Sequence, residues 1–230
     1  MKNDRNTVEF CVRGKRAMFT DPIVGGGAEH FSYQVPTYEA IKGVLKSIYW
    51  KPTFVWVVDK IRVMNSTQKT ECINTKLLQD KGNYDLCRFT YLRDVCYQVS
   101  AHFEWNMNYP SLADDRNVNK HKSIADRMIE RGGRFDVFLG TRECQADVTP
   151  CVFGSGGGFY DNSGDISFGF MSHSFIYPDE ATKEEFKNSF TKTFDNIIMH
   201  NGVIKFTRPE ECEYTRKLKD MRGSGNYEYI

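Results

Sequence analysis

The chain has 230 residues, enough for one large domain or two small ones with a buried core. Hydrophobic residues make up 40% and charged residues 27% of it, which excludes an intrinsically disordered protein. The net charge of +1 argues against a protein that coats nucleic acid indiscriminately, and no apolar run is long enough to span a bilayer.

Signals for targeting and for metal binding are sparse. The segment from Met1 to Arg5 leads directly into a strand-like segment without a signal-peptide core, so we expect a cytoplasmic protein. The seven cysteines form no Cys-x-x-Cys pair, and the five histidines are dispersed. We therefore expect reduced, mostly buried thiols, and neither a metal nor another cofactor.

The first elements alternate between strand and helix. Residues 7–13 alternate apolar and polar side chains, which predicts a strand, and a loop through residues 21–27 follows. Thr37 is the expected N-cap of a helix that ends before Pro52. Four apolar residues form the core-facing stripe of this helix: Ile41, Val44, Leu45 and Ile48.

The next elements repeat the alternation. Residues 54–64 are hydrophobic and β-branched and predict a strand, whereas residues 65–84 predict a long loop or an inserted hairpin. Residues 95–105 alternate strictly and predict a further strand. A helix is expected over residues 119–131, ended by Gly132-Gly133, and a strand over residues 134–140.

This order predicts an α+β fold. Residues 1–140 read β-α-β-β-α-β, the ferredoxin-like arrangement of RNA-recognition domains, with one sheet face or its rim left for a ligand. Residues 141–222 lose helical periodicity and predict a small antiparallel β-sheet domain, with one short helix over residues 182–194. Residues 223–230 predict a flexible tail.

The start of the helix at residue 119 gathers positive charge. Lys120, His121 and Lys122 lie where unpaired backbone amides can meet an anion, and a histidine there can move protons near neutral pH. The same histidine also begins an apolar stripe at helical spacing, and this pattern favours a buried core residue. That stripe contains His121, Ile124, Ala125 and Met128.

Two further segments have features of an RNA-binding site. Tyr49 and Lys51 follow the first helix, where they can contact a base or a phosphate, although aromatic residues at such a position are more often core. The run Gly154-Ser155-Gly156-Gly157-Gly158 lets backbone amides approach a phosphate, but it lacks the Gly-Lys-Ser/Thr of a Walker loop. A flexible hairpin tip explains this run equally well.

Several longer strings resemble one known family. They include Ser32-Tyr33-Gln34-Val35-Pro36-Thr37-Tyr38, Ser47-Ile48-Tyr49-Trp50-Lys51-Pro52, Tyr91-Leu92-Arg93-Asp94-Val95, Gly140-Thr141-Arg142-Glu143-Cys144-Gln145 and Gly154-Ser155-Gly156-Gly157-Gly158-Phe159-Tyr160-Asp161. In this order they resemble the type I-C (Dvulg) CRISPR-associated Cas-five proteins of the RAMP superfamily.

The resemblance implies a specific activity. Members of that family cut the repeat hairpin of precursor CRISPR RNA without a metal, leaving a 2′,3′-cyclic phosphate and a 5′-hydroxyl. They then stay on the 5′ handle with the other subunits of the type I-C interference complex. The family's catalytic residues fall on Tyr49, Lys120 and His121.

We therefore expect an endoribonuclease in which Tyr49, Lys120 and His121 are catalytic. Lys51, Lys122 and the run from Gly154 to Gly158 are expected to hold the RNA backbone. One rival is a non-catalytic RNA-binding subunit of the same complex. A second rival is a metal-dependent DNA nuclease, which would need clustered carboxylates that the sequence lacks outside the Asp114-Asp115 pair.

Overall fold

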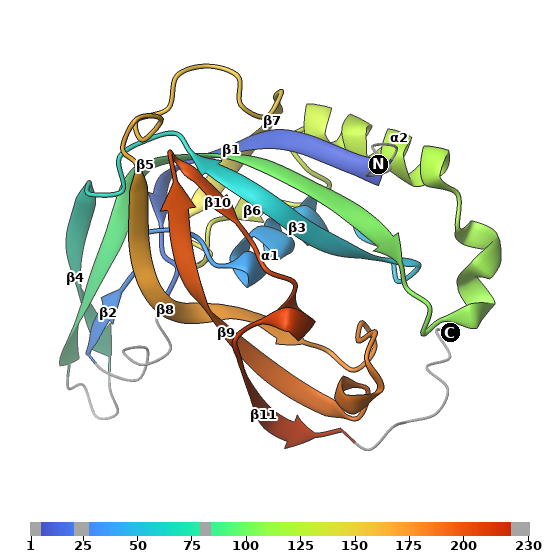
Figure 1. The fold of residues 1–230 in the computed structure, drawn as a ribbon. Coiled ribbons are helices and arrows are strands. Elements are labelled where there is room, and N and C mark those ends of the chain that lie inside the picture. Colours follow the sequence, from blue (N-terminus) through green and yellow to red (C-terminus); the bar gives the residue numbers. More distant parts are fainter. Residues whose placement is uncertain (1–5, 21–27, 79–83, 222–230) are drawn as a thin grey trace.

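The computed structural model describes residues 6–20, 28–78 and 84–221. The loop predicted through residues 21–27 and the tail predicted from residue 223 lie outside these ranges. Two α-helices, α1 (Tyr38–Ile48) and α2 (Val118–Glu130), accompany strands and short 3₁₀ turns (Figure 1). The strands are β1 (Thr7–Ala17), β2 (Glu29–Phe31), β3 (Phe54–Val63), β4 (Thr70–Leu78), β5 (Tyr84–Trp105), β6 (Val137–Phe138), β7 (Gln145–Pro150), β8 (Asp165–Ile176), β9 (Ser189–His200), β10 (Val203–Lys205) and β11 (Tyr214–Asp220). The 3₁₀ turns are η3 (Pro110–Asp115), η4 (Glu184–Phe186) and η5 (Pro209–Glu211).

Local sequence signals account for both helices. The Thr37 hydroxyl accepts a hydrogen bond from the amide of Ala40 and begins α1, whose predicted apolar stripe is buried. Asn117 caps α2 in the same way, by accepting from the amide of Lys120. Gly132 and Gly133 follow α2 with positive φ, as expected of a helix stop. Two of the three helices predicted from the sequence are therefore confirmed, the one that follows Thr37 and the one over residues 119–131.

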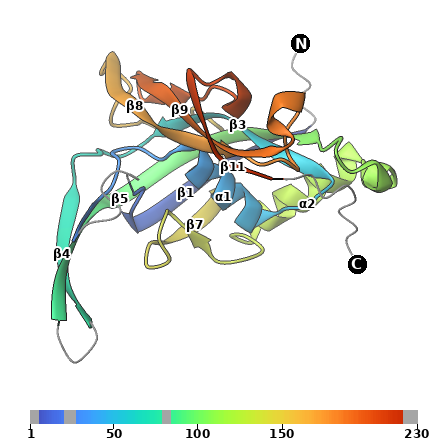
Figure 2. The same ribbon diagram turned by 90° about the horizontal axis from the view of Figure 1, so that it is seen from below.

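The strands form one largely antiparallel sheet in the described residues, with the order β11-β9-β10-β3-β5-β1-β7-β6. The predicted strands over residues 7–13, 54–64 and 95–105 are present, and the third is only the second half of β5. The first half of β5 pairs with β4, so the inserted-hairpin reading of residues 65–84 is confirmed. This ribbon projects away from the remaining structure (Figure 2).

The strand beside β1 differs from the prediction. Residues 134–140 contain only the two-residue strand β6, which pairs with β7 at the edge of the sheet. The position next to β1 is taken instead by β7, which lies beyond the predicted domain boundary at residue 140. Strand pairing over such sequence distances depends on partners that a local pattern does not reveal.

The C-terminal part is mainly β-structure, and the short helix predicted over residues 182–194 is wrong. That segment contains the short turn η4 and the beginning of β9. β8, β9 and β11 form a three-stranded portion of the sheet at one end of the molecule (Figure 1). Within the described residues, no helix is both long and apolar enough to cross a membrane.

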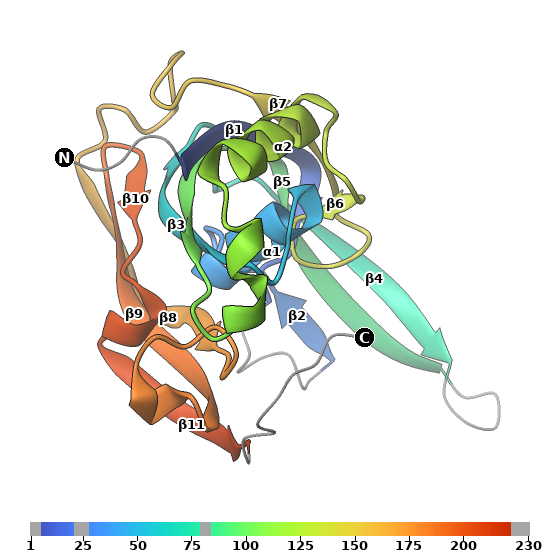
Figure 3. The same cartoon turned by 90° about the vertical axis from the view of Figure 1, so that its right-hand side faces the viewer.

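Both helices pack on the same face of the central strands and contact each other (Figure 3). Side chains of β5 alternate accordingly: Val99, Ala101 and Phe103 are buried beneath the helices, whereas Gln98 and His102 point to the opposite face. A segment that includes the glycine-rich run covers part of that opposite face through a hydrogen bond between Gln98 and the Gly154 amide. The overall class is α+β, with few helices and a mostly antiparallel sheet.

Candidate functional site

The C-terminal end of α1 and the N-terminal end of α2 bring Tyr49 and His121 together. Tyr49 is the C-cap of α1, and its carbonyl accepts a hydrogen bond from the indole of Trp56 at 2.7 Å. His121 lies in the first turn of α2. The Tyr49 hydroxyl is 2.8 Å from Nδ1 of His121, so two residues far apart in sequence form a direct pair.

The partners of His121 determine which ring nitrogen carries the proton. Nε2 lies 2.8 Å from the backbone carbonyl of Asp115, and a carbonyl oxygen only accepts hydrogen bonds. Nε2 must therefore carry a hydrogen, and Nδ1 of the neutral ring is the acceptor. The Tyr49 hydroxyl then donates to Nδ1. Both ring nitrogens are thus engaged.

This pair is buried. His121 is 0% exposed and Tyr49 is 3% exposed. The imidazole packs among the aromatic rings of Phe54, Phe103 and Trp105. Burial raises the pKa of Tyr49, and the nearby charge of Asp115 acts in the same direction. The expectation of a buried stripe that begins at His121 is therefore correct, although this core histidine also contacts Tyr49.

Asp115 connects the buried pair to the surface. Its carboxylate contacts the ammonium of Lys120 at 2.5 Å and accepts from the Thr53 hydroxyl at 2.7 Å. These contacts, with Lys120 first, lower the pKa of Asp115 to about 2, so it is ionised at neutral pH. The Lys120 side chain is 49% exposed. The cluster therefore offers one accessible cation beside a buried hydroxyl–imidazole pair.

The two lysines predicted to hold RNA have different surroundings. Lys51 is exposed just beyond α1. Lys122 forms an ion pair with Asp126 one turn further along α2, at 2.5 Å. Because a phosphate must compete with Asp126 for Lys122, Lys51 is the more available cation.

The glycine-rich run is held on the other face of the sheet. Arg62 is 6% exposed, and its guanidinium donates to the carbonyls of Ser155 and Gly156 at 3.2 and 2.9 Å. It also donates to the carboxylate of Asp161, at 2.6 Å for the shorter contact. Arg62, to which no role was assigned from the sequence, thus holds this loop in place.

These contacts occupy much of the loop's hydrogen-bonding capacity. The amides of Gly154, Ser155 and Gly158 donate to groups within the protein. Since the loop lies on the face opposite α1 and α2, the structure does not bring it beside Tyr49, Lys120 and His121. Four residues of the run are exposed: Gly154, Ser155, Gly156 and Gly157.

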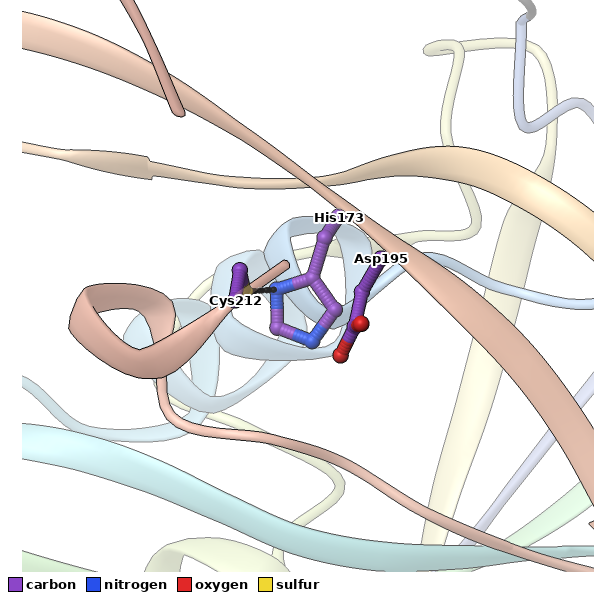
Figure 4. A group of neighbouring side chains, drawn as sticks. All are labelled: His173, Asp195 and Cys212. Carbon is purple, nitrogen blue, oxygen red and sulfur yellow. Dashed lines mark hydrogen bonds between the residues drawn. The ribbon is translucent and has the colours of Figure 1, made fainter. Parts of the chain in front are cut away.

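One group of side chains has the composition of a metal site. His173, Asp195 and Cys212 have potential ligand atoms within 4.8 Å of one another. Cys212 lies at Nδ1 of the buried His173, and Asp195 lies on its Nε2 side (Figure 4). The two nitrogens of a ring point in different directions, so one ion cannot bind at both. His173 stacks on Tyr38, and burial lowers its pKa to about 4, which is typical of a neutral core histidine.

The thiols agree with the expectation of free, mostly buried cysteines. All seven are free, and four of them are buried: Cys11, Cys87, Cys96 and Cys144.

Comparison with known proteins identifies the family. The model of the family described as CRISPR-associated protein (Cas_Cas5) matches residues 7–207, which is most of the chain. The chain belongs to the CRISPR-associated Cas5 family. A Cas5 relative from Mannheimia succiniciproducens, named CRISPR pre-crRNA endoribonuclease Cas5d, is 28% identical over 165 residues, covering 61% of this chain and 71% of the relative.

One further relative and two solved structures are also similar to this chain. A Thermus thermophilus protein with the same name is 28% identical over 148 residues, covering 60% of this chain and 62% of its own length. The crystal structure of a CRISPR-associated protein superposes with a TM-score of 0.72 at 34% identity, covering 91% of this chain and 96% of that one. A functionally uncharacterized Streptococcus mutans protein, SMU1763c, gives 0.71 at 36% identity with the same coverage.

Three residues around the Tyr49–His121 pair were not expected there from the sequence. Asp115 was considered only as part of the Asp114-Asp115 pair, and neither Thr53 nor Trp105 was considered for the site. All three approach the site only because η3 and the ends of β3 and β5 converge on the start of α2. The position of Asp115 two residues before the helix cap was the one local signal for it.

Proposed function

We propose that this Cas5 protein is a metal-independent endoribonuclease that cuts precursor CRISPR RNA within its repeat hairpin, in the cytoplasm. The observation that carries the proposal is the direct contact between Tyr49 and His121 beside the accessible ammonium of Lys120. The names of the Mannheimia and Thermus relatives support the substrate class.

The proposed reaction is an internal transfer at phosphorus. The 2′-hydroxyl attacks the adjacent phosphate, the bond from phosphorus to the 5′-oxygen breaks, and a 2′,3′-cyclic phosphate forms. The 2′-hydroxyl loses a proton to a base, and the departing 5′-oxygen gains one to become a hydroxyl. No cofactor takes part.

His121 is the proposed proton carrier, acting as general base or acid, and Tyr49 orients the 2′-hydroxyl or the phosphate. In the described structure Nδ1 of His121 accepts from Tyr49. The proposal therefore requires that the Tyr49 hydroxyl turn toward the RNA when it binds, which leaves Nδ1 as a free base. The bond from Nε2 to the Asp115 carbonyl keeps the ring in the required tautomer.

Lys120 is proposed to stabilise the phosphorane. Its ammonium is already held in place by the ionised carboxylate of Asp115. A phosphorane carries more negative charge than the starting phosphodiester, so the attraction to Lys120 grows as the reaction proceeds. Asp115 thus acts as the group that positions this cation.

The RNA backbone is proposed to contact Lys51, Lys122 and the run from Gly154 to Gly158, of which residues 154–157 are exposed. After cleavage the protein stays on the 5′ handle as a subunit of the type I-C interference complex. The ferredoxin-like description of residues 1–140 belongs to the same proposal. It is supported by the strand order β7-β1-β5-β3 with both helices on one face.

One experiment tests the activity and the site together. Purified protein is incubated with its cognate repeat RNA in excess EDTA, and wild type is compared with His121→Ala, Lys120→Ala and the control His200→Ala. His200 is an exposed histidine on β9. We expect wild type and His200→Ala to produce a fragment that ends in a cyclic phosphate. The other two variants are expected to cut at least about 100-fold more slowly than wild type.

The second candidate is a non-catalytic RNA-binding subunit. The observation that favours it is the complete burial of His121 with both nitrogens engaged. It predicts that wild type binds repeat RNA without cutting it. Cleavage that EDTA abolishes would contradict both candidates and indicate a metal-dependent nuclease.

A further inference from the structure

The C-terminal strands present an aromatic surface that the proposed chemistry does not use. On β9, Phe190, Lys192 and Phe194 alternate with Thr191 and Thr193, which are buried. The first three therefore share the outward face. Strand register adds Phe170 and Phe175 from β8 and Tyr214, Arg216 and Lys219 from β11 to the same face.

The rings on this face form two groups. Phe170 and Tyr214 are 55% and 53% exposed, and Phe194 lies between them with ring centroids 5.9 Å from each. Phe175 and Phe190 form a second stack, 5.2 Å apart and nearly parallel. Phe170 and Tyr214 are thus exposed to solvent, Phe175, Phe190 and Phe194 are half-buried, and neighbouring rings pack against one another.

Positive charge is interleaved with the rings. The ammonium of Lys192 lies 5.2 Å from the centroid of Phe194 and 5.6 Å from that of Phe175, and so joins the two groups. Arg216 is paired with Lys192 across the strands, and Lys219 is paired with Phe190. Strand register also places the uncharged Ser172 and Asn196 among these rings and cations. The eight residues that supply the rings and cations are Phe170, Phe175, Phe190, Lys192, Phe194, Tyr214, Arg216 and Lys219.

We propose that this face, called here the aromatic platform and defined by those eight residues, binds single-stranded RNA. Unpaired bases stack on exposed rings, and neighbouring cations contact the phosphates between them. The inference rests on the proposed function, since it assigns to the platform the unpaired RNA that flanks the repeat hairpin.

Charge distinguishes RNA from a protein partner on this surface. Protein interfaces are enriched in aromatic residues but depleted in lysine, especially at their centres. Here Lys192 lies at the centre, between the two groups of rings, and Arg216 lies beside it. Rings alternating with cations match the alternation of bases and phosphates along a single strand.

The test measures binding separately from cleavage. A fluorescently labelled single strand of about 12 nucleotides, without self-pairing and without the repeat sequence, is titrated by anisotropy. We expect Phe170→Leu combined with Tyr214→Leu to weaken binding about 10- to 100-fold. The control is Phe135→Leu, since Phe135 is 63% exposed but lies outside the platform.

A second variant, which changes charge and keeps the rings, tests the platform even if the ring variant does not fold. Lys192→Gln combined with Arg216→Gln keeps every ring and removes two cations. Its plot of log binding constant against log salt should be less steep by about 1.4, which is 0.7 for each lost phosphate contact. Both variants are first compared with wild type by circular dichroism and thermal melting.

The outcomes separate this inference from the proposed function. If wild type cuts repeat RNA but both platform variants bind the single strand like wild type, the platform is refuted and the nuclease stands. A protein partner would then be the alternative occupant. If wild type does not cut, yet the platform variants weaken binding as expected, the platform stands and the nuclease is refuted.

Discussion

Replacing Tyr49 with phenylalanine tests the central contact of the site. The change removes one hydroxyl but keeps the ring, which packs against Phe54 with centroids 5.6 Å apart. No cavity forms, so the cost comes from Nδ1 of His121, which loses its 2.8 Å partner in a fully buried position. An unsatisfied buried polar group costs about 1–3 kcal/mol.

That cost translates into a measurable melting shift. For a chain of this length, 1 kcal/mol corresponds to roughly 2–4 °C in Tm. Tyr49→Phe should therefore lower Tm by about 2–12 °C. The matched control is Tyr214→Phe, because Tyr214 is 53% exposed. We expect the control to change stability by less than about 0.5 kcal/mol.

A double-mutant cycle then isolates the contact. His121→Leu leaves the Tyr49 hydroxyl unsatisfied, whereas the combined variant removes both partners. The combined loss of unfolding free energy should be about 1–2 kcal/mol smaller than the sum of the single losses. Urea unfolding of the four proteins supplies these values. An unchanged Tm for Tyr49→Phe, or strict additivity in the cycle, would refute the buried hydrogen bond.

Three further predictions concern residues outside this pair. A hydrogen bond to Asp59, more than any other contact, raises the pKa of His102 from 6.5 to about 9. The resulting stabilisation, on the order of 2 kcal/mol, is complete below pH 6.5 and is lost as the pH rises through 9. In His102→Gln, the free energy of unfolding should therefore depend less on pH over this range. Arg62→Met removes the guanidinium that holds the glycine-rich loop, so we expect a loss of about 2 kcal/mol and faster amide exchange in that loop. Gly140→Ala should destabilise by about 3 kcal/mol or more in thermal melts, because its Cβ would lie 1.7 Å from the carbonyl oxygen of Met18 and φ is +95°.

Two of these predictions have a control variant. Gly43 lies in α1 with nothing within 4 Å of an added Cβ, so Gly43→Ala should stabilise by about 0.5–1 kcal/mol; a loss there would contradict the steric argument. His30→Gln serves as the control for His102→Gln. If the unfolding free energies of the two variants depend on pH in the same way, the pairing of His102 with Asp59 does not cause the pH dependence. Unchanged exchange in Arg62→Met would show that the loop holds its own shape.

For the glycine-rich run, the sequence predicted a loop but not the residues that contact it. The run of glycines predicted a loop whose backbone amides can approach a phosphate. The structure has a loop there, with positive φ at Gly154 and Gly156. Its carbonyls, however, are bound by Arg62, a residue on β3 far earlier in the chain. No periodicity or spacing links those positions, since the link exists only once β3 lies beneath the loop.

The sequence by itself determined the elements whose signals are local. The N-cap at Thr37, the buried stripe of α1 and the strict alternation in β5 each depend on neighbours within a few residues. It also placed His121 on a buried stripe at a basic helix start. The resemblance to a known family, not that pattern, put Tyr49 with it.

Tertiary structure alone decided which distant segments meet. β7 instead of residues 134–140 lies beside β1, because strand pairing is settled by the packing of both faces and not by the strand's own residues. The same convergence brings the Thr53 hydroxyl, just before β3, to the carboxylate of Asp115 beside the site. The hydrogen-bonded pair at the centre of the proposed site is therefore a property of how α1 and α2 dock on the sheet, which no segment of the chain encodes by itself.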